Sequence, residues 1–160
     1  MALLLFCAAV VVLRVTVSGL GELRQATALE EAEPHEAALH YGRALRLYLP
    51  GSPIQSRASE GLVRLARRAQ AEDPLEARFC WEELRSGWLA VRSSFQPGQR
   101  WIREAEAALV PLMLADRRGS WPDPSLPPDE RTAQVRAVLA AREDPALGWV
   151  LVMGLGYALW

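Results

Sequence analysis

Apolar runs lie near both ends of the chain, and the segment between them alternates apolar and polar residues with the period of a helix. The first run, residues 2–20, is apolar apart from Arg14, Thr16 and Ser18. As a helix it would be about 28 Å long at about 1.5 Å per residue, close to a bilayer hydrocarbon core of about 30 Å. Arg14 lies toward one end, where its long side chain can reach the headgroups. We therefore predict that residues 1–20 form a membrane anchor.

A secretory signal peptide and a buried core helix are the two alternatives for this first run. A signal peptide begins with a basic segment and ends at a small-x-small cleavage site. The run has no basic start, and its best cleavage site, Val17-Ser18-Gly19, comes shortly after Arg14. The pattern therefore favours the membrane anchor.

The closing run, residues 146–160, contains no charge. The run has 15 residues, and as a helix it would be about 22 Å long. A membrane crossing needs roughly 20 residues. Trp149, Tyr157 and Trp160 suit the aromatic belt at a membrane surface. No face of the run is polar, whereas a terminal core helix of a small soluble domain normally has a polar face. We expect it to be the start of a second membrane helix that the sequence truncates.

The segment between the runs has apolar stripes with the spacing of one helix face. Proline, glycine and aspartate mark the breaks between the predicted helices. Pro111 predicts a kink or an early end of the last of these helices. At the other end of the segment, residues 21–33 are predicted to extend the helix of the first apolar run. No stretch alternates apolar and polar residues over the length of a strand. The sequence therefore predicts an all-α fold, with antiparallel helix pairs over residues 21–115. The stripes are Ala37, Tyr41, Ala44, Leu45 and Tyr48; Ala58, Leu62, Leu65, Ala66 and Ala69; Ala77, Trp81, Leu84, Trp88 and Val91; and Trp101, Ala105, Ala108, Leu109 and Leu112.

The composition changes after this helical segment. Residues 116–128, DRRGSWPDPSLPP, contain four prolines and no periodic pattern. Such a composition is typical of an extended linker. We predict that residues 129–145 then form a short helix leading to the closing run.

A short motif recurs in the helical segment with an offset of 40 residues. PHEAALHYGRAL begins at Pro34 and PLEARFCWEELR begins at Pro74. Small residues opposite aromatic ones let two helices approach closely, as repeats of helix pairs require. The residues in register are Pro34/Pro74, Glu36/Glu76, Ala37/Ala77 and Tyr41/Trp81.

Over residues 21–92 the chain resembles tetratricopeptide-repeat proteins. The segment ALEEAEPHEAALHYGRALRLYLP looks like the second half of such a unit, with Ala37, Tyr41 and Ala44 at its small and aromatic positions. It departs from the family because Pro50 comes one residue late and because the offset exceeds the family period of about 34 residues. The chain is also similar to uncharacterised bacterial membrane proteins in which a short helical-repeat domain lies beside membrane segments. These resemblances imply a protein-interaction role at the bacterial inner membrane.

The charge balance narrows the possible partners. The net charge is −1 at pH 7 and 51% of the residues are hydrophobic, which argues against both disorder and general nucleic-acid binding. All 18 basic residues are arginines. Several of them, including Arg24 and Arg131, lie on the domain side of the two apolar runs, which favours a cytoplasmic domain. Cys7 and Cys80 lie in separate predicted helices, and we expect no disulfide between them.

No group of residues has the spacing of a catalytic or metal site. His35 and His40 are five residues apart, so on a helix their rings diverge by about 140° and do not share a metal as an H-E-x-x-H motif does. Arg64, Arg67 and Arg68 lie away from the apolar stripe, where they either are solvated or bind a phosphate or lipid headgroup. The closely spaced glutamates at 82–83 and at 104 and 106 do not face each other on a helix. We predict no catalytic, cofactor or metal site.

The segment Ser86–Trp101 combines aromatic residues and arginine near a predicted helix end. One interpretation is a joint between helices with the aromatic rings packed beneath it. The other is a partner surface, since tryptophan and arginine are enriched at binding hot spots; its residues are Trp88, Arg92, Phe95 and Trp101.

The function predicted is a membrane-anchored, non-catalytic interaction or assembly module that contacts a protein partner and the lipid bilayer. The alternative is an accessory subunit embedded in a larger membrane complex.

Overall fold

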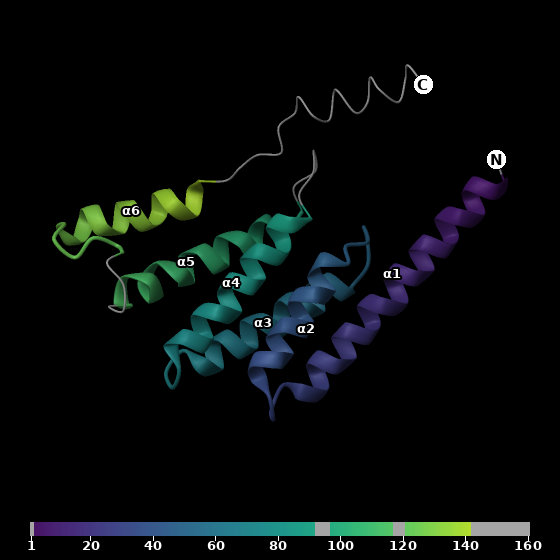
Figure 1. The fold of residues 1–160 in the computed structure, drawn as a ribbon, viewed down its shortest axis with the longest axis horizontal. Helices are drawn as coiled ribbons and strands as arrows, with labels where there is room; N and C mark the ends of the chain where they lie inside the picture. Colours follow the sequence, from purple (N-terminus) through teal and green to yellow (C-terminus); the bar gives the residue numbers. More distant parts are fainter. Residues whose placement is uncertain (1, 92–96, 117–120, 142–160) are drawn as a thin grey trace, which may run out of the picture.

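The structure, a computed structural model, describes residues 2–91, 97–116 and 121–141. These described residues form helices and contain no strand, so the prediction of an all-helical protein is confirmed. Figure 1 shows the helices arranged in chain order from one side of the molecule to the other. They are α1 (Ala2–Leu29), α2 (Pro34–Arg46), α3 (Ile54–Ala69), α4 (Pro74–Ala90), α5 (Gln99–Ala115) and α6 (Pro128–Ala140).

Helix α1 has two halves with different surroundings. It continues past residue 20, as the predicted extension over residues 21–33 requires, and it ends at Leu29. Its C-terminal half packs against α2 and α3, with Leu23 and Ala26 in the core. Its N-terminal half extends beyond the other helices (Figure 1). The apolar segment is therefore part of the same continuous helix as the residues that pack against α2 and α3.

The helices pack mainly with their near neighbours in the sequence. Each helix contacts the next one along the chain, and further contacts join α1 to α3 and α2 to α4. The predicted stripes of α2, α3 and α4 form the core, because almost every stripe residue of these helices is buried. In α5 the buried face is rotated by one position, so that Ile102 is fully buried and Trp101 is half-buried.

The two copies of the repeated motif occupy equivalent places. Pro34 and Pro74 each begin a helix, where the missing N–H of proline costs no helical hydrogen bond. Asp73 caps the second of these helices by accepting from the backbone N–H groups of Leu75 and Glu76, both at 3.1 Å. The alanine and aromatic residue of each copy are buried: Ala37 and Tyr41 in α2, Ala77 and Trp81 in α4.

A buried polar contact fixes the position of α4. The Trp88 indole Nε1–H donates to Ser59 Oγ in α3 at 2.9 Å, and that hydroxyl donates to the Gln55 carbonyl at 2.8 Å.

Gly98 precedes α5 with a left-handed φ of 73°. A Cβ there would lie 2.2 Å from Trp88 Cδ2. Glycine is therefore required both by the backbone conformation and by the indole ring beside it.

Three predictions about the C-terminal third differ from the structure. Helix α5 does not end at Pro111 but runs on to Ala115. Part of the predicted extended linker is a turn instead, in which Asp123 accepts from the Ser125 backbone N–H at 2.9 Å. The Asp123 backbone N–H in turn donates to Gln134 in α6 at 3.2 Å. The predicted helix at 129–145 is α6, which ends at Ala140.

Candidate functional site

The described side chains in the N-terminal half of α1 are apolar apart from Arg14 and Thr16, and most of them are exposed. This half belongs to the one helix in the described part of the chain that is long and apolar enough to cross a membrane, counted as Leu5–Leu29. Only 6% of its most apolar window is buried. The Thr16 hydroxyl donates to the Val12 carbonyl at 2.8 Å, so it needs no water. The exposed large residues are Leu3, Leu5, Phe6, Val10, Val11, Val12, Leu13 and Val17.

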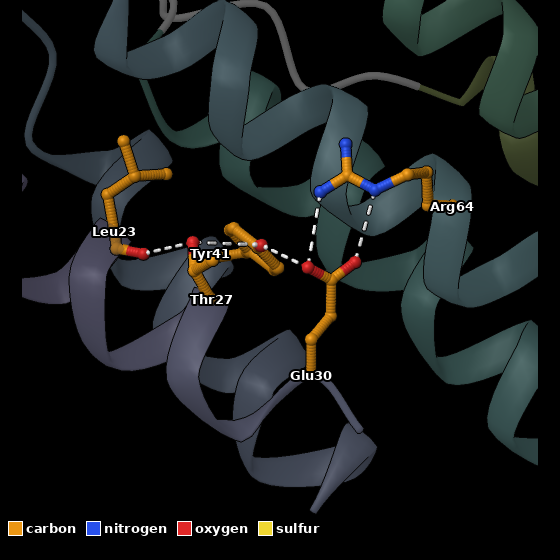
Figure 2. A network of polar contacts seen from close by, with 5 residues as sticks. All are labelled: Leu23, Thr27, Glu30, Tyr41 and Arg64. Atoms are coloured by element: carbon orange, nitrogen blue, oxygen red, sulfur yellow. Dashed lines mark hydrogen bonds and ion pairs between the residues drawn. The ribbon is translucent and has the colours of Figure 1, made fainter. Parts of the chain in front are cut away.

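A polar network joins the other end of α1 to α2 and α3 (Figure 2). The Tyr41 hydroxyl, in the middle of the network, donates to Glu30 Oε2 at 3.0 Å. Arg64 Nε and Nη2 donate to the two oxygens of the same carboxylate at 3.1 and 3.2 Å. Thr27 lies 3.5 Å from the Tyr41 hydroxyl and donates to the Leu23 carbonyl at 2.9 Å.

The ionisation of the network follows from these contacts. Burial, together with the Glu30 carboxylate, raises the pKa of Tyr41 above its usual value. The hydrogen bonds to Glu30 raise the pKa of Arg64. The phenol is therefore held neutral and the guanidinium charged. This combination orients α1 against α2 and α3, and we assign the network a structural role.

A groove of about 620 Å³ lies between α1 and α3 beside this network. Arginines and short apolar side chains line it together. Arg24 and Arg57 are exposed, and their side chains form no hydrogen bond or ion pair with another described residue. Glu60 is the single carboxylate among the lining residues, which are Leu20, Leu23, Arg24, Thr27, Ala28, Tyr41, Arg57, Glu60 and Arg64.

No sequence pattern predicts this groove. Arg24 and Arg57 lie on different helices, 33 positions apart, and neither belongs to a recognisable motif. No local spacing signals their proximity, because it arises only when α3 packs against α1. The one indication in the sequence was the position of Arg24 shortly after the apolar run.

Two of the four residues of the predicted partner surface, Trp88 and Trp101, lie in the described part of the chain. Trp88 is 5% exposed and lies in the core, which agrees with the alternative interpretation of a packed joint. Trp101 is half-buried, with the Arg100 guanidinium 4.3 Å from the centre of its ring. Arg92 and Phe95 lie outside the described residues. Trp88 is therefore buried and Trp101 lies at the edge of the core, whereas the partner surface formed with Arg92 and Phe95 stays a prediction.

The arginine-rich segment of α3 mainly contacts carboxylates within the chain. Arg64 pairs with Glu30 and Arg67 pairs with Glu104 at 2.9 Å, so these two arginines help to join helices. Arg68 is exposed. Two of the three arginines proposed to bind a phosphate at residues 64–68 are therefore already paired with carboxylates of the chain.

The two histidines point to different neighbours. His35 Nδ1 lies 2.9 Å from Glu76 and its ring stacks on Phe79. His40 Nδ1 lies 2.7 Å from Glu22 in α1. Each histidine thus joins α2 to another helix. Within the described part of the chain, no three histidine, cysteine or acidic residues are grouped as a metal site would require.

The closing run, including its predicted membrane helix at 146–160, lies outside the described residues.

Comparison of the chain with protein-family models, with curated proteins and with solved structures gave no match.

Proposed function

We propose that the protein is a membrane-anchored interaction or assembly module, held in the bilayer by the N-terminal half of α1. The observation that carries this proposal is the set of exposed large apolar residues in that half, from Leu3 to Val17. Monomeric soluble proteins rarely expose so continuous an apolar surface. In a bilayer the same residues would contact lipid, and their backbone groups are already bonded within the helix.

The packed helices form the interaction part of this proposal. Contacts between near neighbours in the chain are typical of helical-repeat proteins, which present extended surfaces to partners. The burial of Ala37 with Tyr41 and of Ala77 with Trp81 supports a distant relation to tetratricopeptide-type helix pairs. We place the module at a bacterial inner membrane with its helices in the cytoplasm, because arginines follow the apolar run on the domain side.

The proposed role is non-catalytic. The polar groups of Glu30, Tyr41 and Arg64, which lie between α1, α2 and α3, bind one another. The Cys80 thiol is buried in α4, and burial, together with the Glu76 carboxylate, raises its pKa to about 12. A thiol in that state is a poor nucleophile near neutral pH.

Carbonate extraction of membranes containing the full chain tests the anchor. We expect the parent protein to stay in the membrane pellet. Replacing Val10 and Leu13, which are 47% and 64% exposed, by arginine is expected to release it, because each central charge costs about 2.5–3.5 kcal/mol of insertion free energy. The matched control carries arginine at Ala71 and Ala133, which are exposed outside the apolar half, and should remain in the pellet. Extraction of the parent would refute the anchor.

Exchange of residues 2–17 for an unrelated membrane helix tests the interaction role. If the packed helices bind the partner, proteins that co-purify with the parent should still co-purify after the exchange. Their loss would instead favour an accessory subunit whose contacts lie within the bilayer.

A further inference from the structure

The groove between α1 and α3 lies next to the apolar half of α1. A Cβ added to Gly19 would be 3.3 Å from Ile54 Cδ1, so α3 begins beside the end of the apolar run. Arg24 is five residues further along α1, about 7 Å at 1.5 Å per residue. Arg57 is three residues further along α3, about 4–5 Å. The headgroup layer on each side of a bilayer is about 5–8 Å thick, so an anchored α1 would place both guanidinium groups at the depth of the phosphates.

The charges of the groove suit an anion. Arg64 is bound to Glu30, whereas the Arg24 and Arg57 side chains form no ion pair with another described residue. Glu60 offsets one of these two charges. Guanidinium groups bind phosphate oxygens through paired N–H donors and lose less hydration than ammonium groups.

The apolar surroundings distinguish a lipid from a free phosphate. Leu20 and Leu23 line the groove, and exposed Val17 lies one turn further toward the N-terminus of α1. A phospholipid with its phosphate between the two arginines could extend its acyl chains along this face of α1. An inorganic phosphate would use none of that apolar surface.

We infer that the α1–α3 groove binds the headgroup of an anionic phospholipid through Arg24 and Arg57. This inference rests on the proposed membrane anchoring. Lipid binding by the groove is separate from anchoring by α1. The apolar half of α1 enters any bilayer, whereas the two arginines select the lipid beside it. A bound lipid would also fix the orientation of the packed helices against the membrane surface.

The test uses the full chain in an uncharged detergent, titrated with short-chain phosphatidylglycerol or phosphatidylcholine and followed by native mass spectrometry. Each arginine near anionic lipid strengthens binding on the order of fivefold. Arg24→Gln combined with Arg57→Gln is therefore expected to weaken phosphatidylglycerol binding by about 25-fold. The matched control, Arg103→Gln with Arg136→Gln, removes two exposed arginines outside the groove and should bind like the parent. Circular dichroism checks that both variants are folded.

Several outcomes would overturn the inference. These are equal binding of the two lipids by the parent, an unchanged affinity in the groove variant, and an equal loss in the control. Inorganic phosphate competing at the same concentration as the lipid would assign the groove to a free anion instead. Carbonate extraction of the same proteins separates this question from anchoring: release of the parent would overturn the anchor and this inference together, whereas retention without lipid preference would overturn the groove alone.

Discussion

Gly21 and Gly61 both lie within helices, and replacing each by alanine is expected to change stability in opposite directions. Alanine is favoured over glycine inside a helix by about 1 kcal/mol. At Gly21 a Cβ would meet nothing within 4 Å. Gly21→Ala is therefore expected to stabilise the protein by about 0.5–1 kcal/mol.

At Gly61 the same methyl group has no room. The Cβ would lie 2.3 Å from Cζ of Tyr41, whereas ordinary contact begins at about 3.4 Å. Tyr41 is 1% exposed and its hydroxyl is held by Glu30 at 3.0 Å. The ring therefore has to move by about 1 Å within a packed core, and this motion weakens the hydrogen bond to the carboxylate.

The two costs exceed the gain in helix propensity. An extra methyl group in a packed core costs about 1–3 kcal/mol, and the hydrogen bond to a charged group is worth about 1.5–3 kcal/mol. Against these stands the helical preference of about 1 kcal/mol for alanine. Gly61→Ala is therefore expected to destabilise the protein by about 3 kcal/mol in net terms.

Thermal unfolding of the full chain in detergent, followed by circular dichroism, measures both effects. The midpoint shifts by about 4 °C per kcal/mol for a domain of this size, so Gly61→Ala should lower it by about 12 °C and Gly21→Ala should raise it by about 2–4 °C. In the double variant Gly61→Ala with Tyr41→Leu, the cost should be smaller than the sum of the single costs, because the methyl group occupies space that the ring has left. A midpoint for Gly61→Ala at or above that of the parent would refute the close packing of α2 on α3.

Three further predictions concern the core. Ser59→Ala should cost about 1–3 kcal/mol in urea unfolding, because Trp88 Nε1–H then has no acceptor in the core; an unchanged midpoint would argue against the contact seen at 2.9 Å. Trp81→Ala should cost about 3–5 kcal/mol because its side chain is 2% exposed; a loss under about 1 kcal/mol would place the ring at the surface. Burial first, and then the Glu76 carboxylate, raise the pKa of Cys80 from 9.0 to about 12. The folded state thus holds the thiol proton more tightly, and this contribution to stability is complete below pH 9 and lost as the pH rises toward 12. Cys80→Ala should show a smaller fall in stability over that range, and an equal fall would contradict the assignment.

The sequence by itself determined the helical class and the inner face of three helices. The stripes of α2, α3 and α4 were visible because an amphipathic helix repeats its apolar residues every three or four positions whatever its neighbours are. Pro34 and Pro74 indicated two helix starts for an equally local reason, the fixed φ of proline. The apolar run at residues 2–20 was apparent from composition alone.

The position of Trp88 and the path of the chain before α6 depended on tertiary packing. The same aromatic and arginine residues suit a buried joint or a docking surface, and only the packing against Ser59 places the Trp88 indole in the core. The prolines at residues 122–128 predicted an extended linker, but the contact of Asp123 with Gln134 folds part of it against α6. Such contacts join residues whose proximity no local pattern encodes.

The groove between α1 and α3 was decided by the tertiary structure alone. Arg24 and Arg57 belong to different helices, and each by itself is an ordinary exposed arginine of an amphipathic helix. They line one groove because Gly19 lets Ile54, at the start of α3, pack closely against α1. Local periodicity shows which side of a helix is buried, but the choice of neighbouring helix and the level at which it packs depend on how side chains from distant parts of the chain fit together.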